Sequence, residues 1–135
     1  MNWKSLTALA MLAAIGFAVD ARVQPAHAAS ASLAALDPDK DGTVDLAEAK
    51  AAGAKEFAKL DPDKDGTLDA KELGSRVDAA ALKAADPDSD GTLDEKEYAS
   101  LVGARFRAAD PDNDGTLDDK ELGTDAGKAF LKLVE

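Results

Sequence analysis

The chain has 135 residues, a formal charge of −11, 4% aromatic residues and no cysteine. This length suits one small domain, and because much of the apolar fraction is alanine, which buries little surface, the core is expected to be small. A strongly acidic chain lacks the clustered Lys and Arg that nucleic-acid binding needs. Without cysteine it forms neither disulfides nor thiolate sites. Cations are the natural partners of such a chain.

The first 28 residues are typical of an export signal. Lys4 provides a positive start, residues 5–19 are apolar, and "AHA" at 26–28 fits a small-x-small cleavage site. The apolar run is short for a membrane span, which disfavours an anchored N-terminus. We expect residues 1–28 to be a signal peptide cleaved after Ala28, and residues 29–135 to be the mature domain of a periplasmic protein. That mature chain has 14 basic and 26 acidic residues, a net charge of −12, and no Cys, His, Met or Trp.

Four near-identical loops occupy residues 37–48, 61–72, 86–97 and 110–121. Each reads D-P-D-x-D-G-T-[VL]-D-x-x-E and satisfies the EF-hand loop template in full. Carboxylates at positions 1, 3, 5, 9 and 12 and the threonine carbonyl at position 7 are expected to converge on one ion, with the position-6 glycine making the turn. The predicted metal ligands are Asp37, Asp39, Asp41, Thr43, Asp45, Glu48, Asp61, Asp63, Asp65, Thr67, Asp69, Glu72, Asp86, Asp88, Asp90, Thr92, Asp94, Glu97, Asp110, Asp112, Asp114, Thr116, Asp118 and Glu121.

Short segments join the loops and predict an all-α fold. Residues 49–60, 73–85 and 98–109 hold 12, 13 and 12 residues, and twelve residues make only about 18 Å of helix. Each segment is therefore expected to be one helix that leaves one loop and enters the next. At most two turns fit between residue 29 and the first loop, and residues 124–135 form a further amphipathic stretch. The apolar residue at position 8 predicts short strand contacts between paired loops, which need not be neighbours in sequence.

Proline stands at position 2 of every loop, as Pro38, Pro62, Pro87 and Pro111. Proline has no N–H, fixes φ and biases the preceding residue away from helical geometry. Helix and loop are therefore expected to divide at the first aspartate. A stiffer loop is also expected to discriminate between ions by size or ligand number.

The helices themselves are weak. Glycine interrupts the segments at positions 53, 74, 103, 123 and 127, and each glycine costs about 1 kcal/mol relative to alanine inside a helix. Weak helices, a small core and strong self-repulsion predict a chain that is largely disordered without metal and folds when cations bind.

The ligand set determines which ions fit. All predicted ligands are oxygen, which excludes the usual transition-metal sites and leaves Ca²⁺, Mg²⁺ or a trivalent lanthanide. Mg²⁺ prefers a tighter octahedral site, whereas a bidentate glutamate at position 12 suits larger ions. The five ligand carboxylates of each loop carry far more negative charge than a divalent ion neutralises. Four trivalent ions would neutralise the mature charge of −12. Charge alone leaves calcium and lanthanides both open. The net loop charges of −4, −3, −5 and −5 predict that the second loop is the weakest.

Together, the export signal, the four loops, the intervals of 12 to 13 residues and the position-2 prolines resemble the lanmodulins, periplasmic lanthanide-binding proteins of methylotrophic bacteria. The resemblance covers essentially the whole mature chain. It implies a compact small helical bundle with the loops at its periphery, folding triggered by lanthanide(III) ions such as La, Ce and Nd, and weaker binding of Ca²⁺. It also implies a role in lanthanide uptake or trafficking.

Other functions remain open to different degrees. A periplasmic calcium-binding buffer is the main alternative. A calcium sensor is disfavoured because the mature chain has no methionine for a target-binding groove. The dockerins, exported interaction modules with repeated calcium loops, normally have two repeats rather than four. No His or Cys nucleophile system exists, so we expect no enzyme activity. We also expect a monomer with no membrane partner in the mature form.

Overall fold

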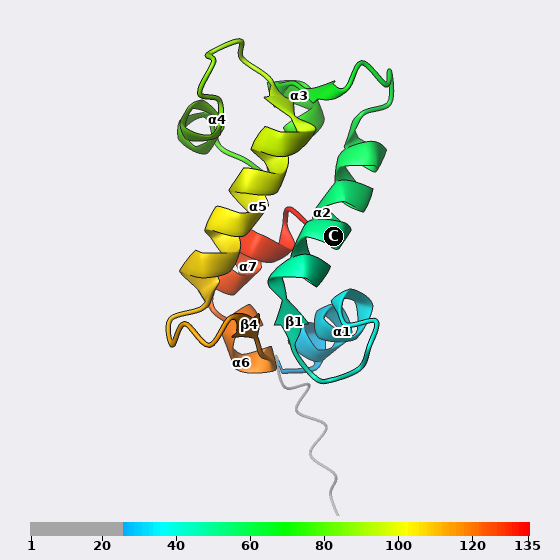
Figure 1. Cartoon of the computed structure of the whole chain (residues 1–135), viewed down its shortest axis with the longest axis vertical. Coiled ribbons are helices and arrows are strands. Elements are labelled where there is room, and N and C mark those ends of the chain that lie inside the picture. Colours follow the sequence, from blue (N-terminus) through cyan, green and yellow to red (C-terminus); the bar gives the residue numbers. More distant parts are fainter. Residues whose placement is uncertain (1–25) are drawn as a thin grey trace, which may run out of the picture.

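The computed structural model describes residues 26–135. Figure 1 shows a helical molecule with irregular loops at both ends of two long helices, and the predicted helical fold class is confirmed. The predicted signal peptide lies outside the described residues, apart from the last three, with which the first helix begins. The helices are α1 (Ala26–Leu36), α2 (Leu46–Leu60), α3 (Ala70–Leu73), α4 (Ala79–Ala85), α5 (Glu95–Ala109), α6 (Asp119–Leu122) and α7 (Asp125–Leu131). The strands are β1 (Val44–Asp45), β2 (Thr67–Leu68), β3 (Leu93–Asp94) and β4 (Thr116–Leu117).

The loops form two pairs, one between neighbours in the sequence and one between the first and last loops. The first loop pairs with the fourth through antiparallel β1 and β4, where Val44 lies opposite Leu117. The second loop pairs with the third through β2 and β3, where Leu68 lies opposite Leu93. All four position-8 side chains are fully buried. The predicted strand contact at position 8 is confirmed, and the structure adds which loops are partners.

Two long helices carry the chain from one loop pair to the other. Helix α2 leaves the first loop and ends at Leu60, directly before the second, and α5 connects the third loop to the fourth in the same way. The prediction of a single shared helix is confirmed for residues 49–60 and 98–109. The two helices pack along each other in Figure 1. They approach closely at Gly53, where a Cβ atom would lie 2.9 Å from a methyl carbon of Val102.

The prediction of one helix over residues 73–85 is wrong. The chain forms α3, a break at 74–78, and then α4. Gly74 ends α3 with φ 54° and ψ −129°, a conformation that side chains disfavour. The Asp78 carboxylate then accepts a hydrogen bond of 2.7 Å from the Ala81 amide and begins α4 as its N-cap. A glycine and a capping aspartate four residues apart therefore make two short helices more favourable than one continuous helix.

Helix α4 is loosely packed, and it ends in Ala85 where α1 ends in Leu36. A groove of about 590 Å³ lies between α4 and α5, lined by Ala85 and Pro87 among others. The equivalent groove beside the first loop is only about 240 Å³, and there the residue before the loop is Leu36, which is 5% exposed. No residue of α4 is buried.

Filling this groove is expected to stabilise the protein. Ala85→Leu should raise the free energy of unfolding of the metal-loaded protein by about 1–2 kcal/mol, because the leucine side chain leaves water as Leu36 does. Thermal unfolding measures the change. The matched control is Ala80→Leu, which adds the same side chain to an exposed position on α4. Equal effects at the two positions would show that burial in the groove is not the cause.

Within residues 26–135, no helix combines the length and the apolarity that crossing a membrane requires. The hydrophobic core lies between α2, α5 and α7. Phe57 packs edge-on against Tyr98 with ring centroids 5.6 Å apart, and Phe106 packs in the same way against Phe130 at 5.9 Å. These contacts hold the two loop pairs at opposite ends of one helical body.

Candidate metal sites in the four loops

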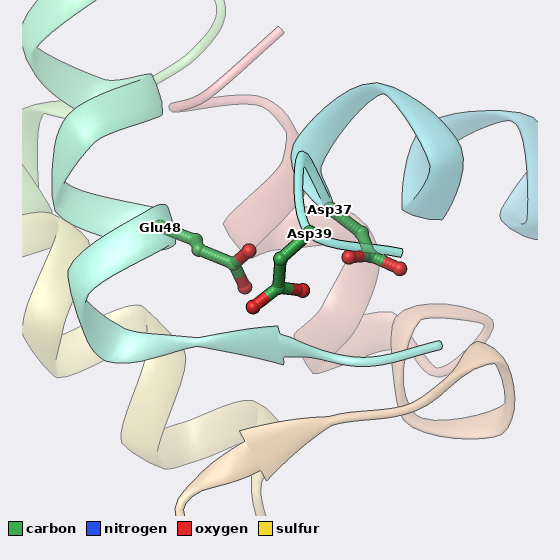
Figure 2. Close-up of side chains that lie close together, drawn as sticks. All are labelled: Asp37, Asp39 and Glu48. Carbon is green, nitrogen blue, oxygen red and sulfur yellow. The ribbon is translucent and has the colours of Figure 1, made fainter. Parts of the chain in front are cut away.

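Each loop gathers three carboxylates around one point. In the first loop, Asp37 comes from the end of α1, Asp39 from the loop and Glu48 from the first turn of α2; in Figure 2 Glu48 and Asp39 extend toward each other, with Asp37 beside them. One oxygen from each of the three lies within 4.8 Å of the others. The same grouping of positions 1, 3 and 12 recurs in all four loops.

Backbone amides fold each loop around its first aspartate. The Asp37 carboxylate accepts hydrogen bonds from the amides of Asp41 at 3.2 Å and Gly42 at 2.9 Å. Asp61 and Asp86 accept the same two bonds in their loops, and Asp110 accepts the bond from Gly115 at 3.1 Å. All four of these aspartates are buried. The acidic side chain therefore organises the turn while its charge stays beside the proposed ion position.

The predicted ligands at positions 5, 7 and 9 are not part of the three-carboxylate groups. In the first loop, Asp41 accepts hydrogen bonds from the Thr43 amide at 2.9 Å and hydroxyl at 2.8 Å. Asp45 accepts from the Glu48 amide at 2.7 Å and so caps α2. The other three loops repeat both arrangements. The structure thus brings together three of the five predicted carboxylate ligands of each loop and gives the position-5 and position-9 carboxylates local hydrogen bonds.

Position 12 combines a capping role with a free oxygen. Glu48 Oε2 accepts a hydrogen bond of 2.9 Å from the Asp45 amide, which completes a capping box at the start of α2. Its other oxygen, Oε1, is buried without a hydrogen-bond partner, and Glu121 Oε1 and Asp110 Oδ1 share that condition. A buried carboxylate oxygen without a partner is costly. A hard cation at the centre of the loop would satisfy these oxygens, so the residues present fit a metal ion.

Crowding of negative charge shifts several carboxyl pKa values. Burial raises the pKa of Glu48 and of Glu121, and nearby aspartates raise it further although a backbone amide opposes them. The pKa of Asp39 is raised, first by its hydrogen bond with Asp37. The pKa of Asp37 is lowered, because the amides around it outweigh its burial. Glu48 and Glu121 therefore hold protons more readily in the metal-free loops than isolated carboxylates do.

This proton affinity predicts a pH dependence of metal binding. A carboxyl with a raised pKa binds its proton at a pH where an ordinary carboxyl is still charged, and the proton must leave before the metal binds. Affinity is therefore expected to be complete near neutral pH and to fall as the pH drops through the raised range. Titration with a metal at steps between about pH 7 and pH 4 measures this. Unchanged affinity over that interval would contradict the predicted competition.

Position 4 has a backbone conformation that the loop pattern does not predict. Lys40, Lys64, Ser89 and Asn113 have φ between 57° and 61°, in the left-handed region. Of these residue types, asparagine adopts that region most readily. The only signal in the sequence was Asn113 itself, because lysine at the same position in two loops obscures the requirement. These loops therefore contain backbone strain that a bound ion would help to offset.

The structure agrees with the predicted effect of the position-2 prolines. Helices α2, α4 and α5 all end at the residue before position 1, and Asp61, Asp86 and Asp110 have ψ between 79° and 84°, outside the helical region. The prolines themselves are exposed. The division between helix and loop at the first aspartate is confirmed. The effect of proline on ion selectivity stays a prediction.

Comparisons with known proteins agree with this geometry. A family model described as EF hand matches residues 54–77 and 103–124. The chain is also 57% identical over 75 residues to lanmodulin from Methylorubrum extorquens. That match covers 56% of this chain and 56% of the relative, so the chain spans about half the length of the curated relative it matches. The four repeated loops and their three-carboxylate groups thus accompany similarity to EF-hand sequences over residues 54–77 and 103–124 and to lanmodulin over 75 residues.

Proposed function

We propose that this protein binds trivalent lanthanide ions in its four loops and folds as they bind. The three-carboxylate group in every loop, with partnerless buried oxygens in two of them, carries the proposal. Each loop also holds two further carboxylates, at positions 5 and 9, so five negative charges surround each ion position. That charge suits a trivalent ion better than a divalent one. The similarity to lanmodulin supports the same assignment.

The roles of the 24 predicted ligands follow from this proposal. Positions 1, 3 and 12 bind the ion directly from the places they already occupy. The position-5 carboxylate contributes the oxygen that does not accept the threonine bonds, and the position-7 threonine contributes its carbonyl. The position-9 aspartate keeps its capping bond and acts through its second oxygen or through a water molecule, as is common at this position.

Lanthanide uptake or trafficking after export to the periplasm is the proposed physiological role. The export signal predicted for residues 1–28 supports this location. A calcium-binding buffer is the second candidate, because the loops satisfy the calcium template at every position. Calcium would bind more weakly than lanthanides under the first proposal and comparably under the second.

A terbium titration tests the lanthanide assignment. Tyr98 directly follows Glu97, the last residue of the third loop, and its hydroxyl donates a buried hydrogen bond. Excitation of Tyr98 is expected to produce terbium emission from that loop. Circular dichroism on the same samples should show helix formation that saturates at four ions per chain. Saturation without added helix, or no terbium binding at micromolar protein, would contradict the proposal.

A further inference from the structure

The C-terminal segment, residues 124–135, begins against the fourth loop. The Thr124 hydroxyl donates a 2.6 Å hydrogen bond to the carbonyl of Glu121, the last residue of that loop, and accepts one of 3.0 Å from the Gly127 amide. Gly127 itself lies so close to this turn that a Cβ atom would collide with the Glu121 carbonyl oxygen and with Leu122. The start of α7 is therefore fitted to the backbone that presents the position-12 glutamate.

The same segment ends against the other loop pair. Phe130 is fully buried and packs on α5 through Phe106. Beyond α7, Leu133 is 1% exposed, and its carbonyl accepts a buried hydrogen bond of 2.7 Å from the Tyr98 hydroxyl. Tyr98 directly follows Glu97, the position-12 glutamate of the third loop. The segment thus contacts the chain beside Glu121 of the fourth loop and beside Glu97 of the third loop. These two position-12 residues belong to different loop pairs.

Ion pairs to a buried glutamate secure the end of the segment. The Glu56 side chain is 4% exposed and binds Lys59 and Arg76, each at 2.7 Å. Burial alone would raise the pKa of Glu56, but the two cations hold it below its usual value. Arg76 also donates a 3.1 Å hydrogen bond to the backbone carbonyl of Glu135. Arg76 lies in the break between α3 and α4, just after the second loop.

We infer that residues 124–135 are a strap that couples ion binding in the two loop pairs, with Tyr98 and Arg76 as its positioning residues. The inference rests on the proposed function. Ions in loops 1 and 4 fix Glu121 and thereby the start of the strap, and the ordered strap then holds Tyr98 beside loop 3. Less of the chain then remains to be ordered when ions bind to loops 2 and 3, so ions in the first pair raise the ion affinity of the second. This is positive coupling. Helices α2 and α5 also join the pairs, so removing the strap bonds should reduce the coupling without abolishing it.

A double-mutant cycle on the full chain tests the strap. In the otherwise unaltered protein, disabling loops 1 and 4 with Glu48→Gln and Glu121→Gln should weaken La³⁺ binding at loops 2 and 3 by about fivefold or more. In a chain that also carries Tyr98→Phe and Arg76→Gln, the same disabling should have a clearly smaller effect. Tyr98→Phe keeps the ring against Phe57, and Arg76→Gln leaves Glu56 paired with Lys59.

Lys132→Gln is the matched control, because this side chain is exposed within the strap and makes none of its bonds to the other pair. It should leave the fivefold effect unchanged. An equal effect with and without the strap bonds would overturn the strap, even if La³⁺ binds tightly to all four loops. No La³⁺ binding by the unaltered chain would instead contradict the proposed function. If the doubly substituted strap does not fold, Tyr98→Phe alone gives the same comparison with the loss of one hydroxyl.

Discussion

Glu97→Gln is expected to weaken lanthanide binding in the third loop by about 100-fold or more, since it removes one charge from a group of ligands around a trivalent ion. Glutamine has nearly the same shape and keeps an oxygen that can accept the 2.8 Å hydrogen bond from the Asp94 amide. The cap on α5 should therefore survive, and the loss should fall on the ion. Terbium emission excited through Tyr98 reports this loop most directly.

Glu95→Gln provides the comparison for this effect. Glu95 lies in the same loop, two residues earlier, and is exposed and outside the three-carboxylate group. The Glu95→Gln substitution removes one negative charge by the same change of side chain as Glu97→Gln. A decrease of only a few-fold is expected for Glu95→Gln, because its charge acts at a distance through water. Similar losses for the two variants would mean that position 12 contributes charge alone and is no ligand.

Removal of metal with a chelator is expected to abolish most of the helical signal. The folded chain holds five or six carboxylates in each loop and a mature net charge of −12, and several helices are only one or two turns long. Isolated helices of that length are marginal in water. The free energy of ion binding therefore supplies the stability that the core lacks.

Circular dichroism of the mature chain with and without La³⁺ measures this change. The spectrum in excess chelator should be that of a largely disordered chain, and La³⁺ should restore the helix. Ala85→Leu offers a useful comparison, because a better packed α4 should preserve more helix without metal. A fully helical spectrum in chelator would show that the core is sufficient and that folding is independent of the ion.

The parts of the fold that follow from local pattern could be predicted from the sequence. The twelve-residue repeat defines the loops, and the fixed intervals predict helices shared between loops, because 12 residues cannot hold two helices and a linker. The one failure, at residues 73–85, has a local cause. Gly74 and Asp78 together terminate one helix and begin another, whereas the spacing between the loops predicts one continuous helix in which that glycine is only a cost.

Features that depend on contacts between distant residues could not be predicted. The pairing of loop 1 with loop 4 depends on how α2 and α5 cross, and Gly53 against Val102 sets that crossing. The bonds from Tyr98 to Leu133 and from Arg76 to Glu135 join residues 35 and 59 positions apart. No periodicity or motif marks such pairs. In the sites, the template names six ligands per loop but does not show that positions 5 and 9 have local hydrogen bonds.

Direct competition between La³⁺ and Ca²⁺ for the mature chain tests the central claim most closely. The protein would be loaded with Ca²⁺ at millimolar concentration and titrated with La³⁺ buffered at low free concentration, with helix content and bound metal measured together. We predict that La³⁺ replaces calcium at all four loops and induces the folded state at a free concentration at least a thousandfold lower (about 4 kcal/mol). Comparable affinities for the two ions would contradict the account and identify a calcium-binding buffer.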